Sequence, residues 1–318
     1  MLKHLVVNSY GVYLGLKSAR LVVKKDGELI KEYPLKNLKT ISIKSRGVGL
    51  SSDLAYACGV RGVKIFFNDF KSHLALHTLH EHKSVNVIKH QILSEQNGKD
   101  LALAKELIIG KIKNQRSTIL YFSRYLQDDL LKQKTTEQLK TFINELKTYK
   151  MTKDSIFGIE GSAAKVYFDY LKQTRLLGDE FVNRTGRFAD DNVNKALNYG
   201  YAILLNIIYK SVINAGLNPY FGVLHSLRSA KPSLVLDIME EYRSFLVDRN
   251  IIKLRHQLKG DFNECKKLIS NEIFSSLAKK LPYNHSKLSL ESIIQRQVYK
   301  LSGFLCGANN YHSYVFRW

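Results

Sequence analysis

The stretch LALAKELIIGKIKNQRSTI, residues 101–119, marks a change from short apolar runs to a helical period. Apolar or neutral side chains recur along it every three or four positions, at Leu101, Ala104, Ile108, Ile112, Gln115 and Ile119. This spacing predicts one face of a long amphipathic helix. The other face is expected to carry the basic side chains, Lys105, Lys111, Lys113 and Arg116. Helical patterns continue over 126–149, 162–177, 192–215 and 233–246 and on to about Cys306, so most of the chain is predicted to be helical.

The sequence before this stretch predicts a small β domain. Short β-prone runs occupy 12–14, 20–23, 29–30, 40–43 and 63–67. Asp26-Gly27 is a hairpin signal between the second and third of these runs. We therefore expect an α+β protein with a small N-terminal β-sandwich-like domain over residues 1–84 and a larger all-α domain over residues 85–318.

The charge of the chain points to a polyanionic partner. Among its 318 residues, 49 are Lys or Arg and 28 are Asp or Glu, which gives a net charge of +21. A compact protein with this excess repels itself unless an anionic partner is nearby, which favours nucleic acid or an anionic membrane surface.

The membrane alternative has little support in the sequence. The longest mostly apolar stretch, Tyr199 to Tyr209, is well short of the roughly 20 residues that span a bilayer. The basic residues are spread over many predicted elements without one apolar face opposite them. We read no secretory signal, and the three isolated cysteines suit a reducing cytosol. The expectation is a cytoplasmic protein without a membrane role.

Three polar clusters in the helical part are candidates for chemistry. Gly158-Ile159-Glu160-Gly161 stands just before a helical pattern that begins at Ser162. Residues 216–225 bring His225 to the end of a short apolar run, and residues 231–243 place Asp237 on one helix face with Glu240 or Glu241. Inward carboxylates and one imidazole in a basic protein suit metal-dependent phosphodiester chemistry with Mg²⁺ or Mn²⁺.

Taken in order, these clusters resemble the CRISPR adaptation integrase family. The matching stretches lie between about residues 85 and 245, at Gln91, 104–115, 158–168, 194–204, 215–225 and 231–243. The resemblance implies dimerisation through the β domain. It also implies that two such homodimers hold a dimer of a small second CRISPR-associated protein, forming a hetero-hexamer on DNA, and it implies a prokaryotic cytoplasm.

The same resemblance assigns the site residues. It implies Glu160, His225 and Glu240 as metal ligands, and Asp237 as a supporting acid within the same catalytic group. It implies that DNA phosphates contact the basic side chains Lys231, Arg184, Arg187 and Arg243.

The expected function is that of a metal-dependent DNA integrase and endonuclease of CRISPR adaptation. Such an enzyme joins the 3′-hydroxyl ends of a prespacer to the CRISPR repeat by transesterification. Two alternatives remain at this stage. One is a stand-alone metal-dependent DNA endonuclease acting in repair, and the other is a non-catalytic DNA-binding scaffold.

Overall fold

The computed structural model divides the chain into two compact units, residues 1–88 and 89–318. The boundary expected from the sequence followed residue 84. The structure describes residues 3–68, 73–76, 82–126, 129–186, 188–226, 228, 231–308 and 310–316. Within these ranges, none of the helices combines the length and the apolar composition needed to cross a bilayer.

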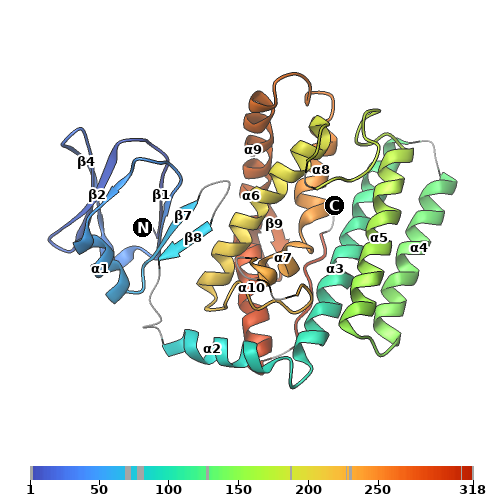
Figure 1. Ribbon diagram of the computed structural model, residues 1–318, viewed down its shortest axis with the longest axis horizontal. Helices are drawn as coiled ribbons and strands as arrows, with labels where there is room; N and C mark the ends of the chain where they lie inside the picture. Colours follow the sequence, from blue (N-terminus) through green and yellow to red (C-terminus); the bar gives the residue numbers. More distant parts are fainter. Residues whose placement is uncertain are drawn as a thin grey trace. The chain divides into compact units, whose positions relative to one another are not determined.

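The first unit is built from two four-stranded sheets (Figure 1). In one sheet the strand order is β1 (His4–Val7), β5 (Thr40–Ile43), β7 (Lys64–Asn68) and β8 (His73–Leu76). In the other it is β4 (Glu28–Pro34), β3 (Arg20–Lys25), β2 (Val12–Lys17) and β6 (Gly49–Leu50). The expected turn joins β3 to β4, and Asp26 and Gly27 have φ angles of 53° and 84°. Both values lie in the left-handed region that a two-residue hairpin turn requires.

A single apolar core holds these strands together. Side chains that alternate along the strands are buried in it, together with Leu54 from α1 (Ser52–Val60) and Leu35 from the one-turn helix η1 (Leu35–Asn37). The side chain of Ser51 accepts a hydrogen bond from the backbone N–H of Leu54 and so begins α1. The predicted β-sandwich-like domain is confirmed.

The second unit is mostly helical. In Figure 1, α3, α4 and α5 lie side by side. The short helix η3 contacts both α3 and α6, and so connects this group to the helices around α6. The helices after α1 are α2 (His82–Leu93), α3 (Lys99–Phe122), η2 (Ser123–Tyr125), α4 (Asp129–Thr148), α5 (Lys153–Gln173), α6 (Asn192–Asn214), α7 (Ser233–Met239), the π-helical η3 (Arg243–Asp248), α8 (Arg249–Leu254), α9 (Phe262–Ala278) and α10 (Leu290–Leu305).

Two details of the helical unit differ from the expectation. The helix α5 begins at Lys153 rather than Ser162, so the glycine-flanked Glu160 lies inside it. Burial of Ile156 and Ile159 outweighs the cost of the two glycines, about 1 kcal/mol each.

The expectation of an all-α domain also needs one correction. An antiparallel hairpin of β9 (Lys280–Tyr283) and β10 (Ser286–Ser289) follows α9. Pro282 disfavours a helical conformation at the residue before it, and the buried Leu281 and Tyr283 alternate as in a strand.

Candidate active site

The carboxylate of Asp237, on α7, organises the loop that carries His225. Its Oδ2 accepts hydrogen bonds from the backbone N–H groups of Val223 at 2.6 Å and Leu224 at 3.1 Å. Its Oδ1 accepts one from the backbone N–H of His225 at 3.0 Å. A Cβ at Gly222 would lie 2.8 Å from Asp237 Oδ2, so only glycine lets the loop approach so closely. Because both oxygens are used in this way, Asp237 acts as a positioning group for the loop.

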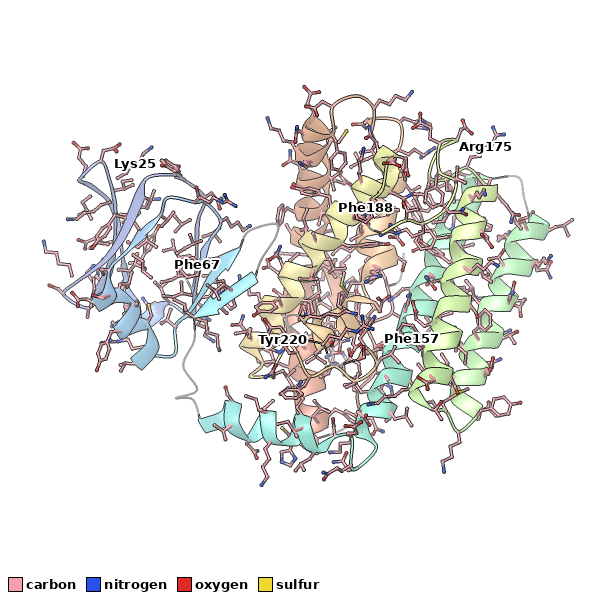
Figure 2. All side chains as sticks on the ribbon, viewed as in Figure 1. Lys25, Phe67, Phe157, Arg175, Phe188 and Tyr220 are labelled. Carbon is pink, nitrogen blue, oxygen red and sulfur yellow. The ribbon has the colours of Figure 1, made fainter. Side chains whose placement is uncertain are left out.

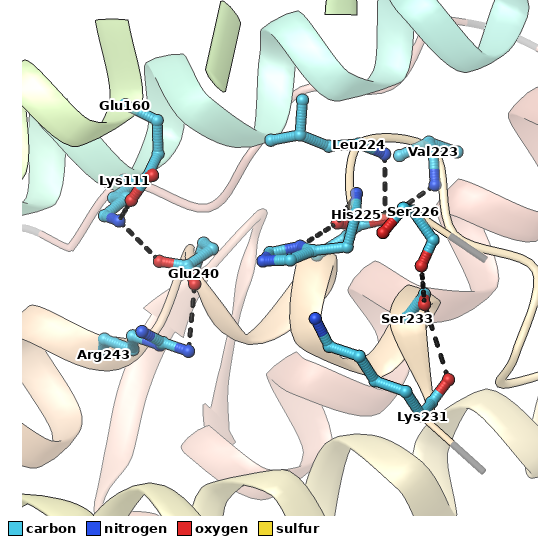
Figure 3. A network of polar contacts seen from close by, with 11 residues as sticks. Lys111, Glu160, Val223, Leu224, His225, Ser226, Lys231, Ser233, Glu240 and Arg243 are labelled. Carbon is cyan, nitrogen blue, oxygen red and sulfur yellow. Dashed lines mark hydrogen bonds and ion pairs between the residues drawn. The ribbon is translucent and has the colours of Figure 1, made fainter. Parts of the chain in front are cut away.

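The same carboxylate fixes the imidazole of His225. His225 Nδ1 lies 2.6 Å from Asp237 Oδ1, which leaves Nε2 as the nitrogen directed away from the loop. The ring points toward Glu240 in Figure 3. The ring of Phe157, which α5 contributes (Figure 2), lies edge-on to it at 5.8 Å between centroids. A carboxylate on one ring nitrogen is the arrangement that orients metal-ligating histidines.

Glu160 and Glu240 meet at one buried ammonium group, that of Lys111 (Figure 3). Lys111 Nζ contacts Glu160 Oε1 and lies 2.6 Å from Glu240 Oε2. The sequence placed Lys111 on the basic face opposite the apolar stripe, but in the structure the residue is buried and only 5% exposed. The three side chains come from α3, α5 and the end of α7, so only the folded helical unit brings them together.

The charges in this cluster stabilise one another. Burial alone would raise the pKa of Glu240, but Arg243 and Lys111 outweigh burial and hold the pKa below its usual value. Burial alone would lower the pKa of Lys111, but Glu240 and Glu160 outweigh it and raise the pKa. Both groups are therefore charged in the folded chain at neutral pH.

A cavity of about 360 Å³ adjoins Lys111 and Glu160. Its lining also includes Arg184, Tyr201, Arg243 and Asp248. The guanidinium groups of Arg184 and Arg243 lie 5.1 and 4.9 Å from the centre of the Tyr201 ring. The cavity thus has a tyrosine ring and two guanidinium groups close to Lys111 and Glu160.

The residues expected to contact DNA lie in different settings. Arg243 donates to Glu240 Oε1 at 3.0 Å, and Arg184 donates to Asn194 at 3.1 Å and Asn198 at 2.6 Å. Lys231 is half-buried just before α7, and its side chain extends on the His225 side of the cluster in Figure 3. Arg187 lies outside the described residues.

Gln91, near the end of α2, holds the first part of the loop that leads to His225. Its side-chain amide donates to the carbonyls of Asn218 at 2.9 Å and Phe221 at 2.8 Å. Its Oε1 accepts from the backbone N–H of Asn218 at 2.9 Å. A glutamine that satisfies three backbone groups fixes the path of the loop that ends at His225.

The side chains of this cluster are of the types that bind divalent cations. Among the described residues, no three His, Cys, Asp or Glu side chains gather closely enough to hold a metal, and Glu160 and Glu240 both contact the ammonium of Lys111. Even so, two carboxylates already share one cation, and Glu240 Oε2 is buried without a hydrogen-bond donor in suitable geometry. Two carboxylates and an imidazole form a donor set that suits Mn²⁺ and, through its oxygens, Mg²⁺.

Sequence reasoning missed the anchor of the C-terminal segment, residues 310–316. Buried Glu241 accepts hydrogen bonds from the Tyr311 hydroxyl and the Tyr314 backbone N–H, both at 2.7 Å. Asn114 on α3 donates to the Glu241 and Tyr314 carbonyls and accepts from the Phe316 backbone N–H. The sequence did indicate Glu241, as one of the two acids that could share a helix face with Asp237. It did not show which residues Glu241 contacts.

The fold places this chain among proteins in which a small unit of two β-sheets is followed by a larger helical unit. A casposase bound to an integration product is similar over 98% of this chain and 93% of that chain, with a TM-score of 0.73 and 22% identity. The chain of a Cas6-RT-Cas1–Cas2 complex is similar over 95% of this chain and 35% of that longer chain, with a TM-score of 0.71 and 21% identity. At these identities the likeness defines the fold alone.

The sequence comparisons define the family. The model of the family described as CRISPR associated protein Cas1 matches residues 5–279. A CRISPR-associated endonuclease Cas1 of Francisella tularensis subsp. novicida is 44% identical, over the full length of both chains. The chain belongs to the Cas1 family of CRISPR-associated proteins.

Proposed function

We propose that this chain is the metal-dependent DNA integrase and endonuclease of CRISPR adaptation. The observation that carries the proposal is the meeting of Glu160 and Glu240 at one cation position, beside an imidazole that Asp237 orients. Family membership and the similarity to an endonuclease and a casposase support the same activity.

In the proposed mechanism each side chain has a distinct task. Glu160, Glu240 and His225 would hold Mg²⁺ or Mn²⁺, which when bound neutralises phosphate charge and favours attack by a hydroxyl. Asp237 keeps His225 in one orientation and one tautomer. Arg243, Arg184 and Lys231 hold the phosphates of the DNA strand, which aligns the scissile bond without reading its sequence.

The proposed reaction is a transesterification. The 3′-hydroxyl of a prespacer strand attacks a phosphodiester of the CRISPR repeat, a new P–O bond forms, and the old 3′-oxygen leaves with a proton. With water as the nucleophile, the same residues would cleave DNA. The net charge of +21 supports DNA as the substrate.

The proposed assembly is based on one of the similar structures. One similar structure is a complex that contains Cas2, which supports the small second CRISPR-associated protein as the partner. We propose that the β unit forms the homodimer, that two homodimers and a partner dimer form the hetero-hexamer, and that it acts in the prokaryotic cytoplasm.

A strand-transfer assay tests the function. The chain is mixed with the small partner, a labelled prespacer with 3′-hydroxyl ends, a plasmid carrying a repeat, and Mg²⁺ or Mn²⁺. We expect Glu160→Gln and His225→Ala to lower integration roughly 100-fold or more, because each removes a ligand, while DNA affinity changes less than about threefold. Lys113→Met, on the helix of Lys111, is the matched control and should integrate normally.

The outcomes separate the proposal from its rivals. Nicking without joined products, in the presence of the partner, would identify a stand-alone endonuclease. Metal-independent DNA binding with no strand breakage, unchanged in the Glu160 and His225 variants, would identify a scaffold. Integration that survives both substitutions would exclude this cluster as the catalytic site.

A further inference from the structure

Lys111 holds the position that a shared cation would take. Its ammonium contacts carboxylate oxygens from two different helices, Glu160 on α5 and Glu240 at the end of α7. The side chain of Lys111 is 7% exposed and that of Glu240 is 4% exposed, so the pair is formed away from water. Figure 3 shows the ammonium directly between the two carboxylates.

A buried carboxylate, Glu240, and a partly buried one, Glu160, need compensating charge when they lie this close. An unpaired charge in a protein interior costs several kcal/mol, and two like charges add repulsion to that cost. Arg243 compensates Glu240 through its other oxygen, Oε1, at 3.0 Å. The ammonium of Lys111 supplies the remaining charge, and it alone links Glu240 to Glu160 among the contacts of the described residues.

A divalent cation and this ammonium exclude each other. Both would occupy the space between the same two oxygens, and their like charges at contact distance repel strongly in a buried setting. The lysine side chain has a flexible four-carbon stem that lets the ammonium move. Lys111 itself lines the adjoining cavity of about 360 Å³, whose lining holds the acids Asp169 and Asp248 as well as Arg184 and Arg243, so the ammonium can move there without lacking an acidic partner.

We propose that Lys111 is the exchangeable counterion of the catalytic cluster. It pairs with Glu160 and Glu240 when no metal is bound, leaves them when a divalent cation binds, and moves into the adjacent cavity. There its ammonium adds a third cation to those of Arg184 and Arg243 for a DNA phosphate. No bond is made or broken and no proton is transferred, so the step is an exchange of cations. This inference rests on the proposed function, because it assumes that the cluster binds metal.

The first test measures metal binding, independently of catalysis. Isothermal titration with Mn²⁺ is carried out on the wild-type chain, Lys111→Met, Lys111→Gln and the control Lys113→Met. We expect both Lys111 variants to bind Mn²⁺ about tenfold more tightly or better, because no ion pair has to be broken first. Without metal, both should unfold at a lower temperature than wild type, and Mn²⁺ should raise that temperature more than in wild type. The glutamine variant keeps hydrogen-bond donors, so it remains informative if the methionine variant does not fold.

The second test measures the released ammonium. DNA with 3′-deoxy ends, which cannot react, is titrated at saturating Mn²⁺ and in chelator. Wild type should gain DNA affinity on adding Mn²⁺ by a larger factor than Lys111→Gln, because only wild type gains a cation in the cavity.

The failures are distinguishable. If wild type binds Mn²⁺ and the Lys111 variants bind it equally or less tightly, the exchange is excluded and the metal site stands. If the folded wild type and the folded variants all fail to bind Mn²⁺, the proposed metal-dependent function fails together with the exchange. An equal gain in DNA affinity in wild type and Lys111→Gln would exclude the move into the cavity.

Discussion

Four acids between residues 237 and 248 form two groups with different partners. Asp237 and Glu240 face a histidine and cations, whereas Glu241 and Asp248 face tyrosine hydroxyls. All four are at most 3% exposed, so burial does not distinguish them. The first group belongs to the acidic cluster of the candidate active site. In the second group, Glu241 anchors the C-terminal segment and Asp248 lines the adjoining cavity.

The partners set the charge of each acid. Burial raises the pKa of Glu241 to about 7 and that of Asp248 to about 6, and their hydrogen bonds offset this only in part. Burial has the same effect on Glu240, but Arg243 and Lys111 outweigh it and lower the pKa. Neighbouring residues 240 and 241 therefore differ in chemistry because they point to different neighbours.

The largest expected effect is on stability, at Glu241. Glu241→Ala leaves the Tyr311 hydroxyl and the Tyr314 backbone N–H without their acceptor in the interior. We expect a loss of about 4 kcal/mol in the free energy of unfolding, measured with urea in the presence of chelator. The exposed Glu180→Ala serves as the control and should change the free energy by less than about 0.5 kcal/mol. A loss below about 1 kcal/mol for Glu241→Ala would show that Glu241 does not anchor the C-terminal segment.

The pH dependence of stability is the next effect, and Asp248 tests it. Its pKa in the folded chain, about 6, lies above its ordinary value of 3.8, so the folded state binds the proton more tightly than the unfolded state does. Its contribution to stability is therefore fully present below about pH 4 and is lost as the pH rises through about 6. The shift corresponds to about 2 to 3 kcal/mol.

Asp248→Asn should remove this contribution. Unfolding in chelator between pH 4 and pH 7 should give a flatter profile than wild type, with most of the remaining slope due to Glu241, whose pKa is raised in the same direction. Identical slopes in both proteins would show that Asp248 is charged in the folded chain throughout this range, as the cation-paired acids are.

The smallest expected effect is the change in stability when alanine replaces a helical glycine, and it depends on whether the added Cβ has free space. An added Cβ at Gly161, next to Glu160, meets nothing within 4 Å. At Gly200 it would lie 2.5 Å from Val247, and at Gly110 it would lie 2.3 Å from Ser313. Gly161→Ala should stabilise the chain by about 0.5 to 1 kcal/mol, because alanine suits a helix better than glycine, whereas Gly200→Ala should destabilise it.

The same substitution tests why glycine occurs beside Glu160. If a DNA strand approaches α5 at this point, Gly161→Ala should lower integration severalfold although it raises the melting temperature. A variant with higher stability and unchanged integration would show that the open space is not used by the substrate.

Local patterns predicted the fold well where they were long. The helical stripe of residues 101–119 became α3, and the Asp26-Gly27 signal became a hairpin turn. The strands that were missed, β1, β6 and β8, are two to four residues long. β1 and β6 pair with strands distant in sequence, β5 and β2, whereas β8 pairs with β7, the strand just before it. The hairpin β9–β10 was missed because it is a short interruption between two strong helical patterns.

The candidate site was predicted in its residues but not in its contacts. Lys111 was assigned to the basic face, although it is three positions after Ile108 and four before Gln115, a spacing that also puts it beside the apolar stripe. A charged residue on a buried face needs a partner of opposite charge, so this spacing could have predicted that Lys111 forms a buried ion pair. That its partners are Glu160 and Glu240 depends on how α3, α5 and α7 pack, which no local pattern contains.

The position of residues 310–316 has a consequence for synthesis on the ribosome. This segment is made after every other element described, yet it covers the face of α3 at Gly110 and satisfies Glu241, the neighbour of Glu240. Until it emerges, Asn114 and Glu241 lack several of their hydrogen-bond partners. A nascent chain can therefore form its helices before residues 310–316 are made, but the packing behind the acidic cluster is completed only after these residues have been synthesised.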